Sequence, residues 1–210
     1  MTPSEILKSR LTECPLVAII RGVTPDEAEA IGAALWEAGI RIVEVPLNSP
    51  DPFASIKRLA RSLGDRALVG AGTVLDPADV ARVKDVGGQV VVSPNTHAPV
   101  IEAAVAAGMV SLPGYFTPSE AFDAIRAGAT GLKLFPAEGA SPAVFKGQRA
   151  VLPKDLPVFV VGGVKPDTMQ SWLDAGADGF GLGGGLYVPG QSAEETSAKA
   201  RAYVEGLGKR

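Results

Sequence analysis

One unit recurs along the 210-residue chain: a helix that ends at a glycine, followed closely by a short apolar strand. Glycine readily adopts the left-handed conformation that ends a helix, so each such Ala-Gly pair indicates a helix C-terminus. Helix starts recur too, as a capping residue followed by proline. The helix ends are Glu37-Ala38-Gly39, Ala106-Ala107-Gly108, Arg126-Ala127-Gly128 and Asp174-Ala175-Gly176, and the helix starts are Thr24-Pro25, Asp76-Pro77, Thr117-Pro118 and Lys165-Pro166.

Eight strand candidates are short and almost continuously apolar, which is typical of parallel strands covered on both faces. They span Leu16–Ile20, Ile42–Val45, Ala67–Gly70, Val90–Ser93, Met109–Pro113, Gly131–Phe135, Val158–Val161 and Gly179–Leu182. Eight parallel units with no strand left over close most simply into a barrel, whereas an open doubly wound sheet usually has five or six strands. The sequence therefore predicts an α/β fold, a (β/α)8 TIM barrel, with an extra N-terminal helix over residues 3–12 that covers the N-terminal mouth.

Composition excludes several classes of protein. The hydrophobic fraction of 46% and the net charge of -3 are typical of a globular enzyme, and we expect one domain over residues 1–210. No apolar run reaches the roughly 20 residues of a membrane span, and the first eleven residues carry Glu5, Lys8 and Arg10, so we expect a cytoplasmic protein with no membrane partner. The chain has no basic cluster for nucleic acid, and its single cysteine, Cys14, predicts a structural thiol.

Two charged residues interrupt strands that are otherwise aliphatic: Glu44 in the second strand and Lys133 in the sixth. In a barrel of this kind, the active site forms at the C-terminal ends of the strands. Period-two alternation places Lys133 on the face of Gly131, opposite the face of Leu132. If the lysine faces the interior, burial would lower its pKa and leave a neutral amine that can attack a ketone. Glu44 could then carry protons, although a purely structural Lys133–Glu44 ion pair is the alternative.

Glycine-rich segments end the seventh and eighth strands, where this fold usually binds phosphate. They are Val161-Gly162-Gly163-Val164 and Gly181-Leu182-Gly183-Gly184-Gly185. Without side chains, their backbone N–H groups can approach an anion closely, although tight turns also use paired glycines.

Other polar residues also follow strands. Arg21 and Thr73 could bind a substrate carboxylate, and Asn48 and Asn95 also lie at strand ends. His97, the sole histidine, is expected on the surface.

Over almost its whole length, the sequence resembles the 2-keto-3-deoxy-6-phosphogluconate and 2-keto-3-deoxy-6-phosphogalactonate aldolases, whose motifs it carries in the same order. The motifs that carry the resemblance are Ile19-Ile20-Arg21-Gly22, Val43-Glu44-Val45-Pro46-Leu47-Asn48-Ser49-Pro50, Gly70-Ala71-Gly72-Thr73-Val74, Ser93-Pro94-Asn95, Leu132-Lys133-Leu134-Phe135-Pro136 and Val161-Gly162-Gly163-Val164. The resemblance implies a class I aldolase, a carbon–carbon lyase that splits a phosphorylated keto-deoxy sugar acid into pyruvate and glyceraldehyde 3-phosphate. It implies no cofactor and no metal, and a homotrimer.

Carried over by position, the family's roles make Lys133 the Schiff-base residue and Glu44 the proton carrier. The remaining positions would bind substrate: Arg21 and Thr73 around the pyruvate carboxylate and carbonyl, Pro94 and Phe135 beside the pyruvyl group, and Gly162, Gly163, Gly183 and Gly184 at the phosphate. Relatives often have serine where this chain has Gly184, so a hydroxyl contact to phosphate would be absent. Val161 and the segment 46–50 look like the phosphogalactonate branch, and the phosphogluconate or dual-epimer activity is the alternative.

Two other functions are compatible with the same residues. An isomerase or epimerase would use Glu44 as a base and Lys133 as an electrostatic group, and would form no covalent adduct. A non-catalytic phosphosugar-binding protein would bind its ligand without turnover. Neither explains a lysine inside a strand as well as imine chemistry does.

Overall fold

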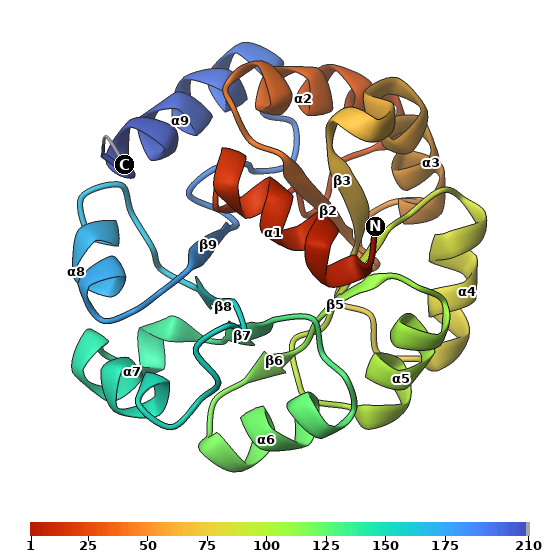
Figure 1. Cartoon of the computed structure of the whole chain (residues 1–210). Helices are drawn as coiled ribbons and strands as arrows, with labels where there is room; N and C mark the ends of the chain where they lie inside the picture. The colour runs from red at the N-terminus through yellow and green to blue at the C-terminus, as the bar shows by residue number, and fades with distance from the viewer. Residues whose placement is uncertain (209–210) are drawn as a thin grey trace.

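The fold is a closed ring of parallel strands surrounded by helices, in a computed structural model that describes residues 1–208 (Figure 1). The strands are β1 Leu16–Ile19, β2 Ile42–Pro46, β3 Leu68–Gly72, β4 Val90–Val92, β5 Val110–Leu112, β6 Gly114–Tyr115, β7 Leu132–Leu134, β8 Val158–Val161 and β9 Gly179–Leu182. The helices are α1 Pro3–Glu13, α2 Pro25–Glu37, α3 Pro52–Leu63, α4 Pro77–Asp85, α5 Ala98–Ala106, α6 Pro118–Arg126, α7 Pro142–Arg149, α8 Met169–Asp174 and α9 Ala193–Gly206, with short 3-10 turns η1 Gly64–Arg66 and η2 Ala137–Gly139.

The fifth predicted strand is present as two pieces, β5 and β6, on either side of Pro113. The sheet order is β5-β4-β3-β2-β1-β9-β8-β7-β6, and β5 pairs with β4 while β6 pairs with β7. Proline has no N–H to donate to a ladder, which interrupts the strand, but the Pro113 carbonyl still accepts from the Lys133 N–H at 2.9 Å. The two pieces therefore close the ring between them, and the predicted (β/α)8 barrel is confirmed.

Most of the predicted helix signals are confirmed. Thr24 with Glu27, and Thr117 with Glu120, form capping boxes at the starts of α2 and α6. The glycines of the four predicted helix ends all have positive φ, between 68° and 107°. The predicted start of a helix at Pro166 is wrong: α8 begins at Met169, because residues 165–168 form a turn in which Thr168 Oγ1 accepts from the Lys165 N–H at 3.0 Å.

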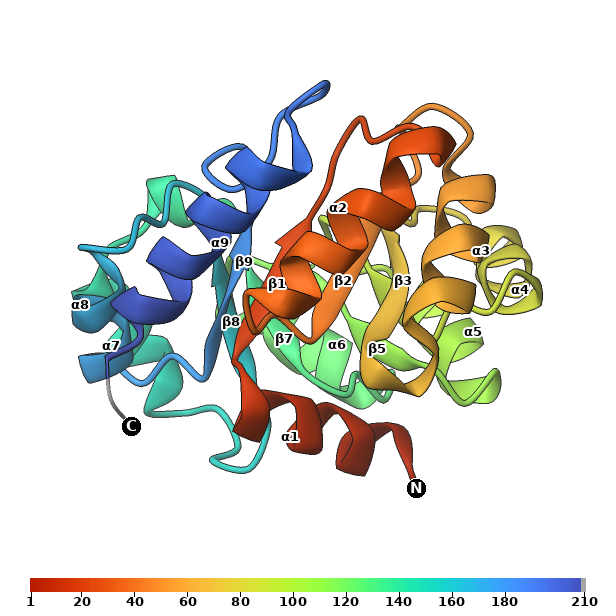
Figure 2. The same cartoon turned by 90° about the horizontal axis from the view of Figure 1, so that it is seen from above.

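The barrel interior is filled by alternate side chains of the strands, including Val17, Ile42, Leu68 and Phe159. Leu7 of α1 belongs to the same interior cluster and is fully buried. Figure 2 shows α1 lying across the end of the barrel where the strands begin. The predicted N-terminal helix thus covers this end, and no helix within residues 1–208 is long and apolar enough to cross a membrane.

Candidate active site

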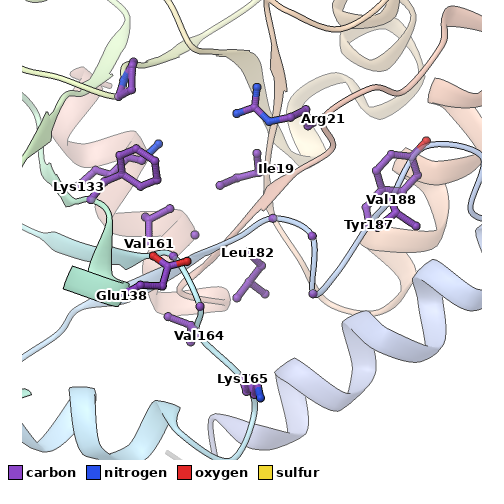
Figure 3. A pocket seen from close by; sticks show the side chains of 18 of the residues that line it. Ile19, Arg21, Lys133, Glu138, Val161, Val164, Lys165, Leu182, Tyr187 and Val188 are labelled. Carbon is purple, nitrogen blue, oxygen red and sulfur yellow. The ribbon is translucent and has the colours of Figure 1, made fainter. Parts of the chain in front are cut away.

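A cavity of about 580 Å³ lies where the C-terminal ends of the strands meet the loops that follow them (Figure 3). Nine of the ten predicted site residues line it: Arg21, Thr73, Pro94, Lys133, Phe135, Gly162, Gly163, Gly183 and Gly184. Glu44, the tenth, lines a small void that it shares with Lys133 and with side chains of the barrel interior. The structure therefore brings residues of six different strand ends together around one cavity.

Lys133 extends from the middle of β7 into the barrel interior. Its neighbours Leu132 and Leu134 pack in the layer between strands and helices, as the period-two alternation predicts. The lysine side chain is only 8% exposed, and its Nζ lies 4.7 Å from the centroid of the Phe135 ring. Burial lowers the pKa of the Lys133 ammonium, and this outweighs the attraction of Glu44. The amine is thus biased toward its neutral, nucleophilic form.

Glu44 lies on β2, with its side chain almost completely buried at 1% exposure. Gly72, at the end of the neighbouring strand β3, makes room for it: a Cβ atom there would lie 1.8 Å from Glu44 Oε2. Burial raises the pKa of Glu44 to about 7, although the positive charges of Lys133 and Arg21 oppose the shift. A carboxyl group with this pKa can both take up and release a proton near neutral pH.

The purely structural ion pair between these residues does not form. Among the residues that the structure describes, no hydrogen bond or ion pair joins Lys133 to Glu44, and Glu44 Oε2 has no hydrogen-bond partner. A buried carboxylate oxygen without a partner is costly unless another group uses it. Both side chains remain available for contacts with a bound molecule.

Replacing Glu44 with glutamine should therefore affect stability in a pH-dependent way. The pKa of Glu44 is raised from 4.5 to about 7 on folding, so its contribution to stability is fully present below pH 4.5 and is lost as the pH rises through 7. Glutamine does not ionise. The unfolding free energy of Glu44→Gln relative to the original chain should rise by on the order of 3 kcal/mol between pH 4 and pH 8.

Chemical denaturation at several pH values measures this difference. Glu102→Gln, at an exposed position on α5, is the matched control and should show no comparable trend. A difference for Glu44→Gln that stays constant from pH 4 to pH 8 would contradict the raised pKa.

Arg21 and Thr73 lie next to each other at the rim. Arg21 Nη2 donates to Thr73 Oγ1 at 3.4 Å, and Arg21 Nη1 donates to Asn48 Oδ1. Ser49 Oγ accepts from the Gly22 N–H at 3.0 Å, which ties the loop after β1 to the loop after β2. The guanidinium group is thus oriented at the cavity wall, where a planar fork of donors can hold a carboxylate.

The glycine segments line the opposite part of the cavity. Gly162 and Gly163 have φ values of 117° and 63°, which side chains rarely adopt. A Cβ atom on Gly183 or Gly184 would meet no atom within 4 Å. The backbone after β9 is therefore open, as an anion-binding segment requires, whereas the Glu138 side chain lies against Gly162 and Gly163 after β8.

Two charged residues of the cavity wall were missed by the sequence interpretation: Glu138, in the η2 turn, and Lys165, after Gly163. Both residues follow the end of a strand, and this position was the only feature of the sequence that could have identified them as cavity residues. Two other expectations hold: His97 is exposed, and Cys14 is buried and forms no disulfide with a described residue.

The chain is similar to known proteins in both sequence and fold. Residues 7–200 match the KDPG and KHG aldolase family. The chain is 49% identical over 194 residues to the 2-dehydro-3-deoxy-6-phosphogalactonate aldolase of Escherichia coli (strain K12), covering 92% of this chain and 95% of that protein. A solved structure described as native KDPGal superposes with a TM-score of 0.91 at 48% identity, covering 93% and 95% of the two chains. A cube-shaped cage designed by fusing symmetric oligomeric domains is also similar, with a TM-score of 0.91 at 49% identity, covering 92% of this chain and 72% of that one.

Proposed function

The chain belongs to the KDPG and KHG aldolase family, and from this premise we propose that it cleaves 2-dehydro-3-deoxy-6-phosphogalactonate reversibly to pyruvate and glyceraldehyde 3-phosphate. The family makes the chain an aldolase, a carbon–carbon lyase. The proposed mechanism rests on one observation: Lys133 is buried, has a lowered pKa and lines the cavity. It shares a small void with Glu44, whose carboxyl group has a pKa of about 7.

In the proposed reaction, the neutral Lys133 amine attacks the C2 ketone and forms a carbinolamine, which loses water to give an imine. Glu44 carries protons in both steps. The positive imine then accepts the electron pair of the C3–C4 bond as that bond breaks. The C4 hydroxyl gives its proton to Glu44 and becomes the aldehyde of glyceraldehyde 3-phosphate. Glu44 returns the proton to C3 of the enamine, and hydrolysis of the resulting imine releases pyruvate and restores the lysine.

The substrate's two charged ends match the two ends of the cavity. Arg21 and Thr73 would hold the carboxylate, with Pro94 and Phe135 beside the pyruvyl group. Gly162, Gly163, Gly183 and Gly184 would present backbone N–H groups to the phosphate. The residues need no metal or cofactor in this scheme, because the protonated imine accepts the electrons.

The test is covalent trapping. The protein is treated with pyruvate and borohydride, and its intact mass is then measured and the modified peptide mapped. A stable pyruvyl adduct on Lys133 is expected. A folded protein that binds pyruvate but forms no adduct would exclude the Schiff base, and would favour an isomerase or epimerase, or a non-catalytic phosphosugar-binding protein.

The epimer preference is a separate prediction. Val161 and the loop 46–50 resemble the phosphogalactonate branch, and the 49% identical relative from Escherichia coli is named for that substrate. We expect a higher kcat/KM for 2-dehydro-3-deoxy-6-phosphogalactonate than for the gluco epimer, from initial rates of pyruvate release. Equal or reversed values would indicate a dual-epimer or phosphogluconate enzyme instead.

We also propose that the protein acts as a homotrimer in the cytoplasm. A chain 49% identical to this one is part of a cage that was designed by fusing symmetric oligomeric domains. This similarity supports the assembly of the protein into an oligomer. Light scattering would read a mass of three times 21.5 kDa for a trimer.

A further inference from the structure

Glu138 is an acidic side chain in the lining of the cavity. The ends are polar: Arg21, Thr73 and Lys133 lie at one end, and Lys165 lies beyond the glycine segment at the other. Between them, the wall consists mainly of apolar side chains, among them Ile19, Phe135, Val161 and Leu182. Figure 3 shows the Glu138 carboxylate between Lys133 and Lys165, close to Val161.

Glu138 is held in this place by the glycines beneath it. A Cβ atom on Gly162 would lie 2.0 Å from Glu138 Oε2, and a Cβ atom on Gly163 would lie 2.8 Å from Glu138 Cγ. The glutamate side chain therefore rests directly on this glycine pair, and any larger residue there would displace it. The absence of side chains at 162 and 163 therefore makes room for Glu138.

The Glu138 carboxylate has no partner of its own. It is exposed to the cavity and, within residues 1–208, makes no hydrogen bond or ion pair. An ionised carboxylate is a strong acceptor and cannot donate, so a ligand group that pairs with it must be a donor. Lys165 also lines the cavity and makes no side-chain hydrogen bond or ion pair with a described residue, so it leaves a positive charge for the phosphate end.

A substrate that extends from Lys133 to the glycine segment carries its hydroxyl groups along this part of the cavity. In the proposed function, on which this inference rests, the C4 hydroxyl gives its proton to Glu44. The C5 hydroxyl lies one carbon nearer the phosphate, and therefore nearer Glu138. A hydroxyl in a mainly apolar section of a cavity loses its water and needs a partner from the protein.

We propose that Glu138 accepts a hydrogen bond from the C5 hydroxyl of the sugar acid, which is the C2 hydroxyl of glyceraldehyde 3-phosphate. Glu138 is thus a specificity-determining residue that selects a hydroxylated, phosphorylated aldehyde. A site built to hydrogen-bond a substrate hydroxyl discriminates strongly against the analogue that lacks it, because the protein group is then left unpaired.

The experiment compares two acceptors in the condensation with pyruvate: glyceraldehyde 3-phosphate and 3-oxopropyl phosphate, which lacks only the C2 hydroxyl. The original chain should prefer the hydroxylated acceptor by about 10- to 100-fold in kcat/KM, the usual effect of a hydrogen bond to a charged group. Glu138→Ala should reduce this ratio to near one, mainly by losing activity on glyceraldehyde 3-phosphate. Glu138→Gln, which keeps an acceptor oxygen, should retain part of the preference.

Two controls separate the possible causes. Lys165→Ala should weaken both phosphorylated acceptors alike and leave their ratio unchanged. Borohydride trapping with pyruvate should still succeed in Glu138→Ala, which shows that the variant is folded and that Lys133 functions. A Glu138→Ala variant that traps pyruvate but loses both acceptors equally would overturn the proposal for Glu138. Failure of trapping in the original chain would instead overturn the proposed function.

Discussion

Replacing Lys133 with methionine is expected to abolish both the trapped pyruvyl adduct and aldol cleavage. Methionine fills a similar volume but has no nucleophilic nitrogen, so no imine can form at this position. Loss of a covalent nucleophile commonly costs several orders of magnitude, and kcat/KM should fall by at least about 10⁴-fold. Trapping followed by intact-mass measurement, together with a pyruvate-release assay, would measure both effects.

The fold of this variant should be unaffected. Lys133 is 8% exposed and its amine makes no hydrogen bond or ion pair with a described residue, so methionine removes a buried polar group that lacks such a partner. Thermal unfolding should therefore show a stability equal to or greater than that of the original chain. Lys154→Met, at an exposed position before β8, is the matched control and should keep both the adduct and the activity. An adduct that persists in Lys133→Met would show that another amine is the nucleophile.

Replacing Glu44 with glutamine should separate proton transfer from imine formation. Glutamine is nearly isosteric and fits the space that Gly72 leaves, but it cannot accept a proton from the C4 hydroxyl. A positioned general acid or base typically contributes 10²- to 10⁴-fold, and kcat for cleavage should fall by about this amount.

Lys133 keeps its amine in this variant, so pyruvate should still be trapped by borohydride, although more slowly. Exchange of the pyruvate methyl protons with deuterated water, followed by NMR, measures the proton transfer alone and should also slow. Glu102→Gln again serves as the control. A kcat within a few-fold of the original value would remove Glu44 from the role of proton carrier.

The sequence alone predicted the elements whose local patterns agree with the overall fold. The positions of the strands follow from short apolar runs between helix signals, and the interior placement of Lys133 follows from the alternation with Leu132 and Leu134. The meeting of distant residues such as Arg21 and Thr73 follows from the fold itself, because all parallel strands of a barrel end at the same face.

The remaining features depend on tertiary geometry. β5 pairs with β4, whereas β6 pairs with β7 on the other side of Pro113. This division depends on how the ring closes, which no local sequence pattern reveals. A proline after a polar residue also predicted a helix start at Pro166, but the Thr168 side chain stabilises a turn instead. The position of Glu138 over two glycines from another loop is a contact between residues that lie about two dozen positions apart, and only the folded chain shows it.

The cover that α1 forms over one end of the barrel has a kinetic consequence. Leu7 fills the interior at that end, so molecules can reach Lys133 only from the cavity side. In the proposed reaction the aldehyde half must depart before the pyruvyl half, because the pyruvyl half stays covalently attached to Lys133 after the C3–C4 bond breaks. We therefore expect ordered release, in which pyruvate competes with the sugar acid for the free enzyme, whereas glyceraldehyde 3-phosphate acts as a noncompetitive product inhibitor.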